Sequence, residues 1–145
     1  MNNSIQKESD NELLKDTSKK WWSNFSQDYV SPGETDHLGV PEDLDDESFL
    51  KYLEYIDGNF MQDGFFAQNR DKTLFSNLIP RNLSGLKVLE IGCGLGAHTE
   101  QLCLSGAEVT SIDLAPQSIN ITKRRLKLKK LSANVFEADA EKLPF

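Results

Sequence analysis

The sequence lacks the features that mark membrane proteins and disulfide-stabilised secreted proteins. Its two cysteines, Cys93 and Cys103, are too few for a disulfide framework, so reduced thiols are expected. No apolar run approaches the length of a membrane span, and the polar first residues contain no hydrophobic signal-peptide core. The 145 residues suffice for one domain with a real core. We therefore expect a cytoplasmic protein with no membrane partner.

Basic residues are scarce in the first part of the chain. Residues 1–60 hold 14 acidic and 5 basic side chains, a net charge of −9, whereas residues 61–145 carry a net charge of +2. Because nucleic-acid binding needs clustered Lys and Arg, this balance argues against a nucleic-acid partner. The one basic run, residues 123–130, is interleaved with leucines and is interpreted as the solvated face of a helix. Two cysteines and two histidines at scattered positions make no metal-ligand set.

Three regions are expected along the chain. Residues 1–20 are polar and lack periodicity, which indicates a disordered tail. Residues 21–80 form an N-terminal helical segment, and residues 81–145 form the main domain. Apolar residues at helical spacing predict helices in the second region at about residues 21–29, 46–60 and 65–79. Asp45 or Asp46 is a plausible cap for the middle helix.

After Pro80, strands alternate with helices. The expected elements are a strand at 88–91, suited to burial on both faces, a helix at 97–105, a strand at 109–114, a helix at 116–131 and a strand at 134–138. Right-handed crossovers between such strands give a parallel sheet in the order 3-2-1. The fold class is therefore α/β and Rossmann-like, with helices expected on both faces of the sheet and an N-terminal helical extension.

A glycine-rich turn follows the first expected strand. Gly92, Gly94 and Gly96 allow a sharp backbone turn and let a ligand lie against main-chain amides. A strand, such a turn and a helix N-terminus together are typical of a nucleotide-type binding corner. Cys93, inside the turn, is expected to pack as a small residue, and His98, shortly after it, to lie at the surface.

Acidic residues end the next two strands. Asp113 lies about twenty positions beyond the glycines, where a carboxylate can accept hydrogen bonds from both ribose hydroxyls. Asp139 could accept from an adenine amino group, while the backbone N–H of Ala140 reaches a ring nitrogen. Since open α/β sheets bind ligands at the carboxyl ends of their strands, the pattern outlines an adenosine site. Asp113 as a helix cap and Asp139 as an ordinary loop acid are the competing interpretations.

Two cofactor classes fit these motifs. The glycine turn with Ala97 also satisfies the dinucleotide fingerprint, with Asp113 as its ribose partner. The acid Glu90 ahead of three alternate glycines, with Asp113 and Asp139 behind them, resembles class I S-adenosylmethionine-dependent methyltransferases more closely. The nearest resemblance is to the small-molecule branch that includes quinone C-methyltransferases, and it covers about residues 86–145.

The resemblance implies a set of cofactor-binding residues: Glu90, Gly92, Cys93, Gly94, Gly96, Asp113, Leu114, Asp139 and Ala140. Glu90 would help to hold the methionine part of S-adenosylmethionine, Asp113 would bind the ribose, and Leu114 would lie against the adenine. The implied reaction is methyl transfer to a small-molecule acceptor, with no catalytic residue or acceptor atom indicated.

A complete member of that family would continue after Phe145 with a fourth strand beside the first. We therefore expect an incomplete cofactor-binding domain whose isolated activity is weak or absent. An NAD-dependent oxidoreductase fragment and a non-catalytic cofactor-binding or interaction module are the alternatives. The sequence carries no signal for the oligomeric state.

Overall fold

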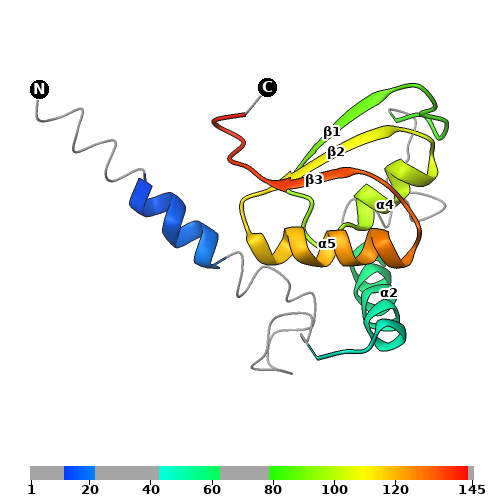
Figure 1. The fold of residues 1–145 in the computed structure, drawn as a ribbon, viewed down its shortest axis with the longest axis horizontal. Helices are drawn as coiled ribbons and strands as arrows, with labels where there is room; N and C mark the ends of the chain where they lie inside the picture. Colours follow the sequence, from blue (N-terminus) through cyan, green and yellow to red (C-terminus); the bar gives the residue numbers. More distant parts are fainter. Residues whose placement is uncertain (1–11, 22–42, 63–78, 144–145) are drawn as a thin grey trace, which may run out of the picture.

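The computed structural model of the chain describes residues 12–21, 43–62 and 79–143. Its labelled elements, in chain order, are α2 (Asp46–Gln62), β1 (Lys87–Ile91), α4 (Ala97–Leu104), β2 (Glu108–Asp113), α5 (Pro116–Leu128) and β3 (Asn134–Glu137) (Figure 1). A further helix covers residues 12–21. Apart from Trp21 and Ile79, the helices expected at 21–29 and 65–79 lie outside the described residues.

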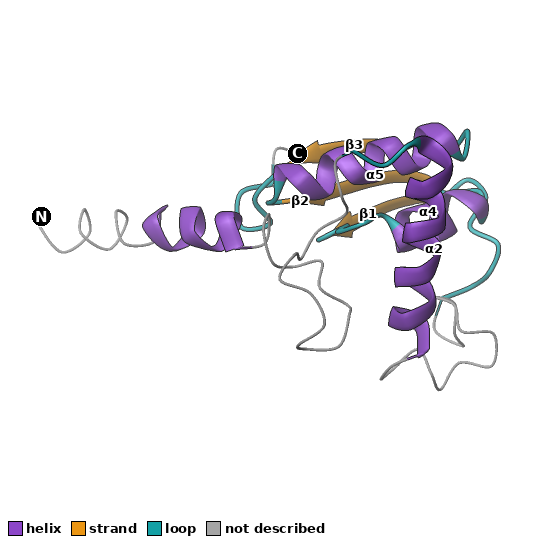
Figure 2. Cartoon of the chain, turned by 90° about the horizontal axis from the view of Figure 1, so that it is seen from below, coloured by secondary structure: helices purple, strands orange, loops and turns teal. Residues whose placement is uncertain are grey.

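The three strands form one parallel sheet in the order β1-β2-β3, as the sequence predicts. Both crossover helices, α4 and α5, lie on the same side of this sheet (Figures 1 and 2). Two right-handed crossovers that advance in the same direction place their helices on one face. The expected cover of both faces is therefore not found in the part of the chain that the structure describes.

The core lies between the sheet and these two helices. Under α4, Leu83, Leu102 and Val109 pack together, and under α5, Val135 packs with Ile119 and Leu126. The other face of β1 is open, with Leu89 39% and Ile91 55% exposed. The prediction that this strand is buried on both faces is thus wrong for the described structure, because α4 covers only the side of Val88 and Glu90.

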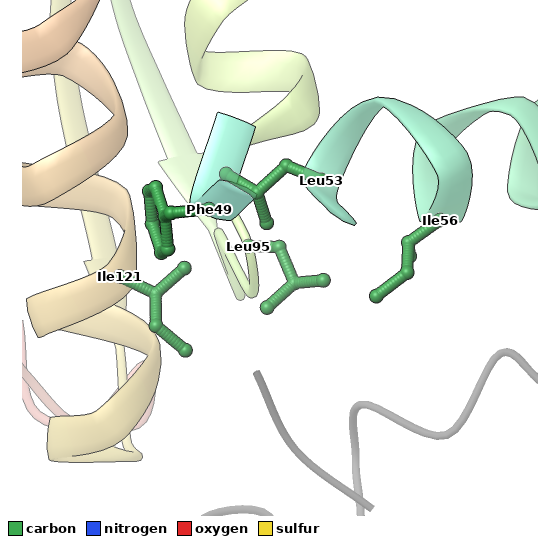
Figure 3. Packing of buried hydrophobic residues seen from close by; sticks show 5 residues of the cluster. All are labelled: Phe49, Leu53, Ile56, Leu95 and Ile121. Carbon is green, nitrogen blue, oxygen red and sulfur yellow. The ribbon is translucent and has the colours of Figure 1, made fainter. Parts of the chain in front are cut away.

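Helix α2 packs across the glycine turn. Its apolar side is formed by Phe49, Leu53 and Ile56, which meet Leu95 of the turn and Ile121 of α5 (Figure 3). Asp45 caps the helix, because its Oδ1 accepts the backbone N–H of Ser48 at 2.8 Å. The expected helix and the first of its two candidate caps are confirmed.

Residues 12–20 differ from the expected disordered tail, since residues 12–21 are helical. Within the helix, Lys20 pairs with Asp16 one turn earlier at 2.8 Å. Lys15 and Lys19 form ion pairs with acidic residues at the end of β3. Charge pairs therefore hold this helix together and against the sheet. A pattern of apolar residues does not indicate such pairs. Within the ranges described, no helix combines the length and the apolarity needed to cross a bilayer.

Candidate functional site

The glycine turn joins the end of β1 to the start of α4. Gly92, Gly94 and Gly96 all have left-handed backbones, with φ of +75°, +52° and +79°. The N–H groups of Gly92 and Cys93 both donate to the carbonyl of Ile112 in β2, at 2.8 and 3.1 Å. The turn is therefore fixed to the carboxyl end of the neighbouring strand, where open α/β sheets bind ligands.

The three glycines have different surroundings. A Cβ at Gly92 or Gly94 would meet no atom within 4 Å, whereas a Cβ at Gly96 would lie 2.9 Å from the side chain of Thr122. Thr122 is fully buried in α5, and its hydroxyl donates to the carbonyl of Gly94 at 3.0 Å. The first two glycines thus leave the backbone open to a ligand, while Gly96 permits close packing of the turn on α5.

Asp113 lies directly against the turn. Its Oδ2 accepts the N–H of Gly94 at 2.9 Å, and its Oδ1 accepts the N–H of Ala115 at 2.9 Å, just before α5. One carboxylate therefore ties the glycine turn to the start of the next helix. Leu114 is half-buried beside it. The structure brings the expected ribose acid to the turn, but Asp113 is not the cap of α5, whose N-cap residue is Ala115.

Glu90 points toward α4 from the end of β1. Its carboxylate accepts hydrogen bonds from the hydroxyls of Thr99 in α4 and Ser111 in β2, the latter at 2.7 Å. Burial raises the pKa of the Glu90 carboxyl, and the nearby charge of Asp113 raises it further. The two hydroxyl hydrogen bonds lower the pKa, but burial has the larger effect. Glu90 is thus a half-buried acid held between α4 and β2.

Asp139 lies just beyond the end of β3. The N–H of Ala138 donates to the carbonyl of Asp113 at 3.0 Å, which brings this loop beside the end of β2. Asp139 Oδ1 accepts the N–H of Glu141 at 2.9 Å, and Oδ2 accepts from the Lys15 ammonium. The contact with Lys15 lowers the pKa of the Asp139 carboxyl. Ala140 is exposed next to it.

A pocket of about 130 Å³ lies between α2 and the glycine turn. It is lined by Ile56, Asp57, Gly92, Cys93, Gly94, Leu95, Ala97 and His98. Sites for whole small ligands usually measure about 300–1,000 Å³, so this pocket would take only part of a nucleotide-sized molecule. His98 is half-buried here, not at the surface as expected, and burial lowers its pKa.

Cys93 turns its side chain away from the ligand side of the turn. The thiol is buried with Ile119, Leu126 and Val135, and burial raises its pKa to about 12. A thiol with such a pKa stays protonated near neutral pH and is a poor nucleophile. The predicted packing function of Cys93 is confirmed.

The sequence interpretation missed Arg125. Only 3% of this residue is exposed, and its Nε donates to Glu100 of α4 at 2.6 Å. Its other nitrogens donate to Asp57 of α2 and, at 3.3 Å, to the carbonyl of Leu95 in the turn. One side chain thus connects α2, α4 and the glycine turn.

The interpretation of residues 123–130 as a solvated helix face is therefore wrong for the two arginines of this run, Arg124 and Arg125. Arg124 lies over the ring of Phe49, 4.1 Å from its centre, and pairs with Asp46 at 2.8 Å. Arg125 lies four residues after the buried Ile121, so helical spacing already places the two on one face. That spacing is the signal that could have identified it.

A larger hollow, about 630 Å³, lies at the other end of the sheet. Its lining includes Lys87, Glu108 and Asn134, the first residues of the three strands. Because ligands of open α/β sheets bind at the carboxyl ends of the strands, the pocket at the glycine turn is the candidate site.

Comparison with known proteins finds a family that matches the last part of the chain. A family described as "Methyltransferase domain" matches residues 88–145. The ubiquinone biosynthesis O-methyltransferase of Methylocella silvestris is 45% identical over 53 residues, covering 37% of this chain and 21% of that protein. The magnesium-protoporphyrin O-methyltransferase of Rhodobacter capsulatus is 44% identical over 48 residues, 33% of this chain and 21% of that protein.

A longer match is to the ubiquinone biosynthesis O-methyltransferase of Pelagibacter ubique, 33% identical over 91 residues, which covers 63% of this chain and 34% of that protein. The chain therefore spans only about a fifth to a third of these curated relatives. The relatives are named as O-methyltransferases, whereas the sequence pattern suggested a branch that includes C-methyltransferases.

The fold is also found among solved structures. The crystal structure of the [4+2]-cyclase SpnF matches with a TM-score of 0.50 at 16% identity, over 90% of this chain and 44% of that chain. This likeness concerns the fold alone. The family match over residues 88–145 and the relatives named above show that this segment, which contains the glycine turn and Asp113, is similar to methyltransferase domains.

Proposed function

We propose that this chain supplies the cofactor-binding part of an S-adenosylmethionine-dependent methyltransferase that acts on a small molecule. The observation that carries the proposal is the contact between Asp113 and the N–H of Gly94, 2.9 Å long. This contact brings the carboxylate of Asp113, for which we propose ribose binding, next to two glycines where a Cβ would meet no atom within 4 Å. A ligand can approach the main chain closely at such a point.

The residues of the site fit the parts of this cofactor. A carboxylate offers about four acceptor positions, so Asp113 can keep its two backbone hydrogen bonds and still accept from ribose hydroxyls. Asp139 and the N–H of Ala140 would bind the adenine, with Leu114 against its ring. Glu90 would attract the ammonium group of the methionine part from beneath the turn. The backbone from Gly92 to Gly96 would line the path between these groups.

The bound cofactor would supply an electrophilic methyl group on its sulfonium. The chain would contribute orientation, because transfer needs donor and acceptor held in line, and exclusion of water by the wall that α2 forms over the turn. The relatives named above are O-methyltransferases, which favours an oxygen atom of a small molecule as acceptor. Since the chain covers a small share of those proteins, we expect cofactor binding by these 145 residues without efficient turnover.

The test is a calorimetric titration with S-adenosylhomocysteine, the demethylated cofactor. The D113N variant removes the charge that would bind the ribose, and hydrogen bonds to charged groups contribute about 1.5–3 kcal/mol. We expect D113N to weaken binding by about 10- to 100-fold. The D43N variant, which makes the same change at an exposed position before α2, should bind like the wild type. Equal binding by D113N and D43N would contradict the proposal.

A further inference from the structure

The helix over residues 12–21 lies beyond the carboxyl ends of the strands, next to the loop that follows β3 (Figures 1 and 2). Two of its lysines reach that loop and strand. Lys15 contacts Asp139 and also pairs with Glu141 at 2.7 Å, while Lys19 contacts Glu137. The helix is therefore held at the same edge of the sheet as the proposed adenine-binding residues.

Both oxygens of Asp139 already have partners. Oδ1 accepts the N–H of Glu141 at 2.9 Å, and Oδ2 accepts from the ammonium of Lys15. About three quarters of each side chain is covered, since the Lys15 side chain is 24% and the Asp139 side chain 25% exposed. The carboxylate keeps further acceptor positions, but Lys15 occupies one of them and covers part of the side chain that a ligand would have to reach.

We propose that Lys15 is an autoinhibitory latch that competes with the adenine of the cofactor for Asp139. The inference rests on the proposed function, which assigns the adenine amino group to this carboxylate. A neutral amino group is a weaker partner for a carboxylate than an ammonium. Cofactor binding therefore has to displace Lys15, and with it the contacts that hold the helix over residues 12–21 against the sheet.

The latch is electrostatic and should respond to salt. Partly exposed ion pairs are screened as ionic strength rises, whereas hydrogen bonds to a neutral adenine depend on it much less. The wild-type chain should therefore bind the cofactor more tightly at higher salt. A chain without Lys15 should lose this dependence.

The test compares the K15Q variant with K20Q in the full chain, titrated with S-adenosylhomocysteine at low and at high salt. Both variants remove one positive charge from the same helix, but Lys20 pairs with Asp16 inside the helix and not with the sheet. Ion pairs that stay partly exposed are weak, so we expect K15Q to bind about two- to fivefold more tightly than the wild type at low salt, and K20Q to bind like the wild type.

Hydrogen exchange supplies a second readout. Ligand binding should speed amide exchange in residues 12–21 of the wild type, because the helix is released. Equal affinities of K15Q, K20Q and the wild type would overturn the latch while leaving the proposed function intact. Weaker binding by K15Q would also overturn it, since Lys15 would then assist the ligand. If none of the three chains binds the ligand, the proposed function itself fails.

Discussion

Gly94 and Gly96 share a left-handed backbone but differ in what a side chain would meet. At Gly96, a Cβ would collide with the buried Thr122, so G96A combines about 1–2 kcal/mol of backbone strain with about 1–3 kcal/mol of overpacking. We expect G96A to lose about 2–5 kcal/mol of unfolding free energy in urea titrations. The matched variant G94A should lose only about 1–2 kcal/mol, from backbone strain. Equal losses would contradict this difference.

Glu90 gives the chain a pH dependence of defined sign. Burial raises the pKa of its carboxyl above the ordinary 4.5, so the folded state binds this proton more tightly than the unfolded state. The contribution of Glu90 to the free energy of unfolding therefore falls as pH rises from about 4.5 through the raised pKa. Above the raised pKa it stays constant.

E90Q cannot ionise and escapes this cost. In urea titrations at a series of pH values, the unfolding free energy of the wild type minus that of E90Q should fall as pH rises above 4.5. A difference that is flat, or that rises with pH, would show that the two hydroxyl hydrogen bonds outweigh burial.

The positions of residues in the fold were predictable where spacing alone decides them. The glycines, Asp113 and Asp139 follow from their positions at strand ends, and the structure brings Asp113 to the turn. Helical spacing could place Arg125 on the side of Ile121, but its ion pair with Asp57 was not predictable, because Asp57 lies in α2, a helix distant in sequence. The cofactor contacts of the site residues remain predictions.

At the scale of elements, Arg125 joins three parts of the structure through charge. Replacing it with Met would leave Glu100 and Asp57, which the arginine now neutralises, without this partner. Removing one member of a buried ion pair costs about 3–5 kcal/mol. We expect R125M to lose about that much unfolding free energy, whereas K127M, at an exposed position of the same helix, should change it by less than about 0.5 kcal/mol.

Helices and strands of the main domain were predictable because their apolar residues repeat with the right period. The helix over residues 12–21 was not, since Leu13 and Leu14 are 68% and 66% exposed and form no apolar face. Its order depends on lysines that meet acids more than a hundred residues away. The position of α4 and α5 on one face of the sheet was predictable from the strand order, because two right-handed crossovers in the same direction lead to one side.

At the scale of the whole molecule, one face and one edge of the sheet carry exposed apolar residues. Leu86, Leu89 and Ile91 are 50%, 39% and 55% exposed, and β1 has a sheet neighbour among the described residues only on the side of β2. Open apolar strands of this kind promote association. Sedimentation velocity should show concentration-dependent association of the 145-residue chain that I91K reduces. The L104K variant, at the exposed Leu104 of α4, should associate like the wild type.

The central claim is that the carboxyl edge of this sheet binds S-adenosylmethionine and not a dinucleotide. The most direct test is thermal unfolding of the chain with S-adenosylhomocysteine or with NAD at equal concentrations, because a ligand that binds only the folded state raises the melting temperature. S-adenosylhomocysteine should raise it, and D113N should reduce the rise, while NAD should leave it unchanged. Protection by NAD without protection by S-adenosylhomocysteine would contradict the account.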